Sequence, residues 1–342
     1  MILRILTLFF LVVFAACVVS AQEQPRRIGS IDFFGYAGLN LTQVKAALPV
    51  QVGDQFPGSS ETKEGIRKAV TSVIGGPPTD IAPVCCDAQG NFMIYIGLPG
   101  ESIKPPKYNR LPTGKTRLPQ QIIDLYQQTM DASGAAVLRG VISEDRSQGY
   151  ALSIGDSDLR SKQLAARAYA LQHERLIRTV LYTSGDAQQR IVAAYLLGYA
   201  RQSRRQIAGL VHGSQDPDDD VRNNATRALG VLAASNAKVA ARIPAGGFIR
   251  MLSSGSWTDR NKAAWVLAAL TGSRDRIVLA RLRSEAWVTL MEMARWRSAL
   301  HASNARLLLA RIEGIDEERA QQLANSDNAD DVINALRNPR KN

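Results

Sequence analysis

Side chains that could act as acids, bases or nucleophiles are scattered along this 342-residue sequence. The densest group is Glu144, Asp145 and Arg146 in the irregular stretch 140–153, where adjacent carboxylates could serve as an acid–base pair. Neighbouring carboxylates in a loop are usually solvated, and neither a histidine nor a nucleophile lies near them in sequence. We therefore expect no catalytic residue. The alternative of an enzyme, or of an accessory subunit, places its site at this junction.

Metal and cofactor sites have no clear pattern in the sequence either. The histidines are far apart: His173, His212 and His301. No Cys/His set has the spacing of a metal site, and no HExxH, GxSxG, Walker or GxGxxG motif occurs. We expect no metal, no cofactor and no small-molecule substrate.

Regular spacing occurs instead in the C-terminal half, where one pattern is found three times. The copies start at Arg190, Arg222 and Arg260, and each has Ala three residues on, Leu seven on and a small residue eight on. An acidic turn precedes each copy and a second apolar segment follows it, at 206–212, 243–252 and 277–290. Helix, turn and helix at a period of about 30–40 residues indicate stacked helical hairpins. Weaker copies are marked by Ala305 with Leu309 and by Lys162, Ala165 and Tyr169.

The segment Asp216–Ala225 (DPDDDVRNNA) resembles the HEAT repeat. The resemblance implies an all-α solenoid of the armadillo type over residues 158–312, with a polar cap or tail over 313–342. It also implies a structural ladder of acidic and arginine side chains between successive repeats. The residues that take this role are Asp186, Arg190, Asp216, Arg222, Asp259 and Arg260.

A small α+β domain is predicted over residues 27–100, in the order strand, helix, helix, strand, strand. The expected elements are a strand at 27–34, a helix at 41–48, a second helix capped by Ser60, and strands at 81–86 and 92–98. Ile28–Gly35, Val52–Phe56 and the closing hairpin resemble a POTRA domain. The resemblance implies binding of extended peptides at an exposed sheet edge, while a generic α+β domain remains the alternative.

Residues 101–157 join the two parts. The prolines and basic residues of 104–119 predict an extended, exposed tether, followed by a helix at 120–133. Cys85 and Cys86 are adjacent, and neighbours on a strand point to opposite faces, so we favour two separate side chains over a disulfide.

The N-terminus predicts export. Arg4 precedes the apolar run Ile5–Phe14, and Val19-Ser20-Ala21 forms a small-residue cleavage site, so residues 1–21 are interpreted as a signal peptide. The mature chain is then periplasmic or extracellular. Two alternatives stay open: an uncleaved anchor, and a lipoprotein whose first mature residue is Cys17.

The formal net charge of +11 suggests electrostatic binding. Arginines cluster at two predicted helix–helix turns and form a candidate binding surface: Arg201, Arg204, Arg205, Arg274 and Arg276. We interpret the chain as a non-enzymatic scaffold of the cell envelope that binds a protein partner. Binding of anionic envelope lipids or polymers is an alternative, and nucleic acid is not expected.

Overall fold

The first part of the described chain is a small α/β unit, the N-terminal module (residues 26–103). The computed structural model describes residues 26–337, so the predicted signal peptide and Cys17 lie outside the described residues. The elements of the module are β1 (Ile28–Phe34), α1 (Leu41–Ala47), α2 (Ser59–Ile74), β2 (Asp80–Cys85) and β3 (Phe92–Gly97). The central strand β3 is parallel to β1 and antiparallel to β2.

Local sequence explains how α2 packs on the sheet. Ile66 and Val70, four residues apart, fall on one helix face and are buried. The helix begins at Ser59 after Gly58, which has no side chain to cap it, so the predicted cap at Ser60 is wrong. It ends at Gly75, whose φ of 76° is a conformation that glycine adopts without strain.

The edge strand β2 contains two features of note. Pro83 lies within it, and an edge strand is where the missing N–H of proline costs least. The structure joins Cys85 and Cys86 in a disulfide, whereas the sequence analysis favoured two separate side chains. Nη1 of Arg26 lies 3.0 Å from each of the two sulfur atoms.

After residue 119, the regular secondary structure of the described chain is helical except for one short hairpin. This hairpin, formed by β4 (Glu144–Asp145) and β5 (Leu152–Ser153), lies in the stretch predicted to be irregular. The helices are α3 (Gln120–Leu138), α4 (Ser157–Thr183), α5 (Ala187–Gly198), α6 (Arg204–Gly213), α7 (Asp219–Ser235), α8 (Ala237–Ala240), α9 (Ala245–Met251), α10 (Trp257–Leu270), α11 (Arg276–Ala294), α12 (Ala299–Ile312), α13 (Glu317–Ala324) and α14 (Ala329–Arg337).

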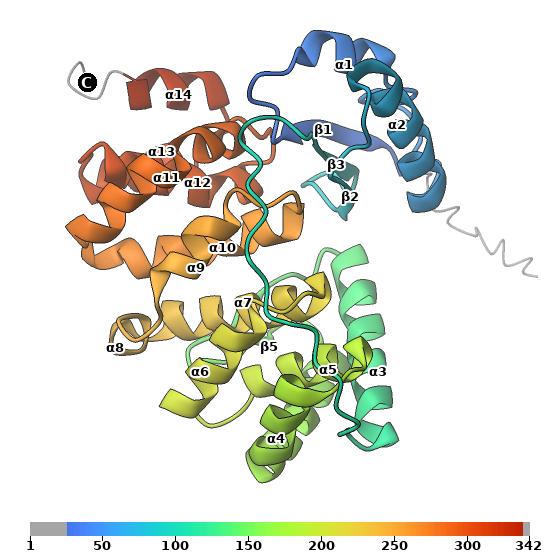
Figure 1. The fold of residues 1–342 in the computed structure, drawn as a ribbon, viewed down its shortest axis with the longest axis vertical. Helices are drawn as coiled ribbons and strands as arrows, with labels where there is room; N and C mark the ends of the chain where they lie inside the picture. The colour runs from blue at the N-terminus through green and yellow to red at the C-terminus, as the bar shows by residue number, and fades with distance from the viewer. Residues whose placement is uncertain (1–25, 338–342) are drawn as a thin grey trace, which may run out of the picture.

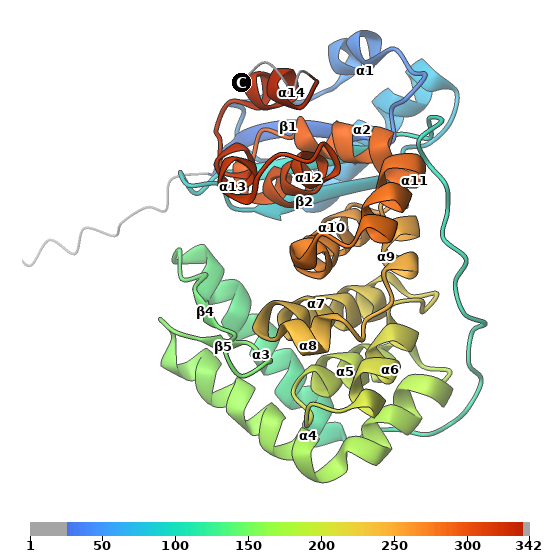
Figure 2. The same ribbon diagram turned by 90° about the vertical axis from the view of Figure 1, so that its left-hand side faces the viewer.

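Four of these helices form a row: α5 packs on α7, α7 on α10, and α10 on α12. At one end α3 and α4 pack on α5, and at the other α13 packs on α12. Figures 1 and 2 show this succession from α4 to α14. The fold is thus a helical region preceded by a small α/β part.

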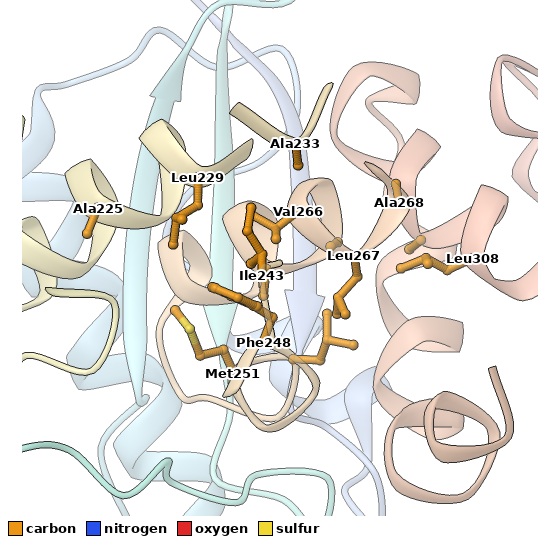
Figure 3. Packing of buried hydrophobic residues seen from close by; sticks show 14 of the residues in the cluster. Ala225, Leu229, Ala233, Ile243, Phe248, Met251, Val266, Leu267, Ala268 and Leu308 are labelled. Carbon is orange, nitrogen blue, oxygen red and sulfur yellow. The ribbon is translucent and has the colours of Figure 1, made fainter. Parts of the chain in front are cut away.

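Small residues let the helices of the row approach closely. A Cβ added to Gly198 would lie 2.9 Å from the Cβ of Ala228, and one added to Gly230 would lie 2.7 Å from the ring of Trp265. Figure 3 shows buried aliphatic side chains of the row, including Leu229 on α7, Leu267 on α10 and Leu308 on α12. These contacts form one continuous apolar core along the row.

Residues 104–118 form a strap along one edge of the row (Figures 1 and 2). Backbone N–H groups of the strap donate to carbonyls at or just beyond the ends of three helices: Lys104 to Ser253 (2.8 Å), Asn109 to Gln215 (2.7 Å) and Gly114 to Thr183 (2.7 Å). The strap is extended, as predicted, but it is not a free tether. An extended backbone without internal bonds leaves its N–H groups available to loop carbonyls.

The N-terminal module packs on the far end of the row. The N–H of Trp257, the first residue of α10, donates to the carboxylate of Asp80 (2.8 Å), so the module caps the start of α10. The N–H of Arg297, in the loop before α12, donates to the carboxylate of Asp32 (3.1 Å). Trp296 is fully buried between the two parts, and its Nε1 donates to the carbonyl of Phe33. Within residues 26–337, no helix has the length and apolar character needed to cross a bilayer.

Candidate functional site

Arg190, Arg222 and Arg260 are buried. Each binds a carboxylate that lies further along the chain, and we call each helix of the row, with the loop before it, a layer. Arg190 donates to both oxygens of Asp216, at 2.8 and 2.9 Å. Arg222 binds Asp259 in the same bidentate way, at 2.9 and 3.1 Å. All four side chains are at most 4 % exposed. The two pairs join α5 to the loop before α7, and α7 to α10.

The third arginine has a partner that sequence reasoning missed. Arg260 donates to Glu292 near the end of α11, at 3.1 Å. The same carboxylate accepts the Ser102 hydroxyl (2.7 Å) and three consecutive backbone N–H groups at 35–37, so it ties the row to the N-terminal module. Glu292 is only 2 % exposed.

Asp186, the remaining residue assigned to the ladder, binds the strap. Its carboxylate accepts from Arg117 at 2.9 Å and touches no repeat arginine. Further along the strap, the ring of Tyr108 covers the guanidinium of Arg222 (4.2 Å to the ring centroid), and its hydroxyl donates to Asp259. The strap therefore covers the edge of the row that holds these ion pairs.

The arginines predicted as a binding surface lie at two separate turns. Arg201, Arg204 and Arg205 lie at the turn between α5 and α6, whereas Arg274 and Arg276 lie between α10 and α11, with the layer of α7 in between. Arg274 donates to Glu317 and to the carbonyl of Ile315. The other four side chains are exposed and have no hydrogen bond to any described residue. The structure does not bring the five together.

A cavity of about 250 Å³ lies where α3, α4, α5, α7 and α10 meet. We call it the inter-helix cavity. Its polar wall includes Gln163, Tyr195, Tyr199, Asn223, Arg227 and Lys262, and Met130, Leu159 and Val231 are among its apolar residues. Tyr195 and Arg227 lie five residues after Arg190 and Arg222, and Lys262 lies two residues after Arg260, so side chains from α5, α7 and α10 surround one space.

The β4–β5 hairpin brings Glu144 beside this cavity. One oxygen of Glu144 accepts from Arg227, and the other accepts from Nε and Nη2 of Arg146 at 3.0 and 2.9 Å. Burial opposes ionisation, but the two arginines hold the pKa of Glu144 below its ordinary value. A bond from the Ser147 N–H lowers the pKa of Asp145. Both carboxylates are therefore ionised at neutral pH, which does not favour the acid–base role considered for them.

Lys262 is the cation of the cavity without an acidic partner. It is half-buried, and within residues 26–337 no hydrogen bond or ion pair joins its ammonium group to another side chain. Burial, together with the charge of Arg227, lowers the pKa of Lys262 to about 8. The cavity can thus hold an anionic group. No histidine or cysteine is among the described residues that line it.

The sequence contained a partial signal for this site. The positions five residues after Arg190 and Arg222 both line the cavity, and the periodicity identifies these two positions as equivalent. Comparison of the sequence with models of known protein families gives no match, and comparison with curated proteins gives none either.

Proposed function

We propose that this chain is an exported, non-enzymatic scaffold that binds a protein partner in the cell envelope. Its binding surface is a HEAT-like α-solenoid, and a POTRA-like module is fixed at one end of it. The observation that carries the proposal is the succession of buried Arg–carboxylate pairs between layers. They hold successive helices at a set spacing, so that side chains such as Tyr195, Arg227 and Lys262 present a preformed surface.

The HEAT-like interpretation is supported by where the ion pairs run. Arg190 and Arg222 each reach an acid at the start of the next repeat, as the implied ladder requires. Each helix of the row contacts its neighbours in the row, which is the organisation of a repeat protein.

The POTRA-like interpretation is supported by element order and by the sheet order β1-β3-β2. Export rests on the sequence of residues 1–21 alone.

Binding of an anionic envelope surface is a second candidate function. It is supported by the exposed side chains of Arg201, Arg204, Arg205 and Arg276.

Site-specific photo-crosslinking in the source cells tests the scaffold function. A photoreactive residue replaces Asn304, which occupies the place on α12 that Lys262 occupies on α10, and a matched control replaces the exposed Ser284 on α11. We expect a discrete crosslinked protein from position 304 and none from position 284. No product from either position, or the same products from both, would contradict the proposal.

A further inference from the structure

Cationic groups outnumber carboxylates around the inter-helix cavity. Arg227 and Lys262 line it and Arg146 lies on the adjoining hairpin, while Glu144 is the carboxylate that binds both arginines. Apart from the bond to Glu144, the guanidinium of Arg227 has no acceptor within residues 26–337, and neither has Lys262. Two cationic side chains therefore lie at the edge of a partly enclosed space with donors that have no acceptor in the protein. Such an arrangement attracts an anion.

Glu144 shows which kind of anion this surface binds. Its planar carboxylate lies between two guanidinium groups, one on each oxygen. Arginine presents a fixed fork of donors that matches the geometry of a carboxylate. A second carboxylate, placed between the unused face of Arg227 and the ammonium of Lys262, would repeat this arrangement deeper in the cavity.

The uncharged wall adds a further requirement. The side-chain oxygen of Asn223 is buried at the cavity and has no hydrogen-bond partner among the described residues, so it lacks a donor such as a peptide N–H. The hydroxyls of Tyr195 and Tyr199 bond to each other at 3.3 Å on the same wall. The cavity of about 250 Å³ equals roughly eight waters at about 30 Å³ each, which suits one long side chain.

From these three observations we infer that the inter-helix cavity is a carboxylate pocket, which takes one aspartate or glutamate side chain of the protein partner. Arg227 and Lys262 bind the carboxylate, and Asn223 accepts the N–H of the same or a neighbouring residue. The inference rests on the proposed scaffold function and names the chemistry by which the partner is recognised.

Protection of Lys262 from acetylation tests the pocket in the full chain. An amine-reactive acetylating reagent is applied with N-acetylglutamate, and the rate at each lysine is measured by peptide mass spectrometry. At about 10 mM N-acetylglutamate we expect acetylation of Lys262 to slow about threefold, as for a ligand with a Kd of about 5 mM. Lys63 and Lys68, exposed on α2, should react at unchanged rates.

N-acetylglutaminamide at matched ionic strength is the uncharged control, because both of its carboxyl groups are amides, and it should give no protection. Equal protection by both compounds, or none by either, would overturn the pocket. Stronger protection by inorganic phosphate would overturn the carboxylate assignment in favour of a phosphorylated partner. The variant Arg227→Met should lose the protection of Lys262. If this variant does not fold, the comparison of the two compounds on the wild-type protein decides whether the pocket exists. A crosslink at position 304 without protection of Lys262 would leave the scaffold function standing and remove only the pocket.

Discussion

Charged side chains in two regions of this molecule differ in how they are matched by opposite charge. Between the layers of the row, Arg190, Arg222 and Arg260 each bind a carboxylate, and every member of these pairs is almost fully buried. Around the inter-helix cavity, Lys262 has no acid to bind and Arg227 uses one of its donors.

The difference separates structural from functional charge. A buried ion pair costs free energy to desolvate, and breaking it strands the remaining charge, so matched pairs specify one arrangement of layers. An unmatched, half-buried cation is kept at a cost in stability, which is the usual sign of a site that binds something. Four predictions test this contrast.

The largest effect is expected from Glu292→Ala. The change strands the buried Arg260 and removes the acceptor for three backbone N–H groups and for Ser102. We expect the free energy of unfolding, measured in urea, to fall by about 3–5 kcal/mol. The control is Glu285→Ala, which breaks the exposed pair with Arg281 and should cost about 0.5 kcal/mol or less. A loss below about 1 kcal/mol for Glu292→Ala would mean that the pair does not hold the layers.

The next effect concerns acid stability at the contact between the module and the row. Nδ1 of His301 lies 2.6 Å from the Tyr95 hydroxyl, and burial, with the charge of Lys262, lowers the pKa of His301 to about 4. The unfolded value is about 6.5, so the unfolded chain binds more protons between these values and stability falls as the pH drops through that window. We expect the wild type to lose about 2 kcal/mol more than His301→Gln between pH 6.5 and 4.

Asp32 acts in the opposite direction near the same contact. Burial raises its pKa to about 6, so the folded state binds more protons than the unfolded state between about pH 4 and 6. This contribution is present in both proteins and cancels in their difference. Parallel pH profiles for wild type and His301→Gln would show that His301 is not buried in its neutral form.

The strap is expected to contribute a smaller amount. Tyr108→Ala removes the ring over Arg222 and a hydrogen bond to Asp259, while leaving their ion pair in place. We expect a loss of about 1–2 kcal/mol in unfolding free energy. Lys107→Ala, at the exposed neighbouring position, should be close to neutral. Equal losses of unfolding free energy for the two variants would mean that the strap connects the two parts without stabilising the row.

The smallest effect is predicted for Lys262→Met. Because burial favours the neutral amine, the charged form opposes folding at neutral pH, so the variant should be as stable as wild type or up to about 1 kcal/mol more stable. The unfolding free energy of the wild type should rise relative to that of the variant as the pH increases from 8 toward 10.5, the ordinary pKa of lysine. Exposed Lys238→Met is the matched control. A loss of about 2 kcal/mol would place Lys262 among the structural charges.

Sequence reasoning predicted the order of elements in the N-terminal module, because that order follows from short-range patterns. It also singled out Arg190, Arg222 and Arg260, which the structure buries in ion pairs. It missed Glu292, which lies near the end of α11 and meets Arg260 only through tertiary packing. It assigned Asp186 to the ladder by its place before a repeat, but Arg117 from the strap reaches it instead.

Two further features depend on long-range geometry. The strap is a Pro-rich segment whose bonds go to loops distant in sequence, and no local pattern encodes them. The inter-helix cavity needs residues from α3, α4, α5, α7 and α10 together. The residues that line it differ from one copy of the sequence pattern to the next, so the pattern does not indicate their joint chemistry.

The most direct measurement is the pKa of the Lys262 amine in the full chain, followed by NMR of lysines labelled with ¹³C at Cε and assigned with Lys262→Met. The contrast between matched and unmatched charge predicts a pKa of about 8 in the free protein. It also predicts a rise toward the ordinary value when N-acetylglutamate is added, because a bound carboxylate favours the ammonium form. A pKa near 10.5 that N-acetylglutamate does not change would contradict the account.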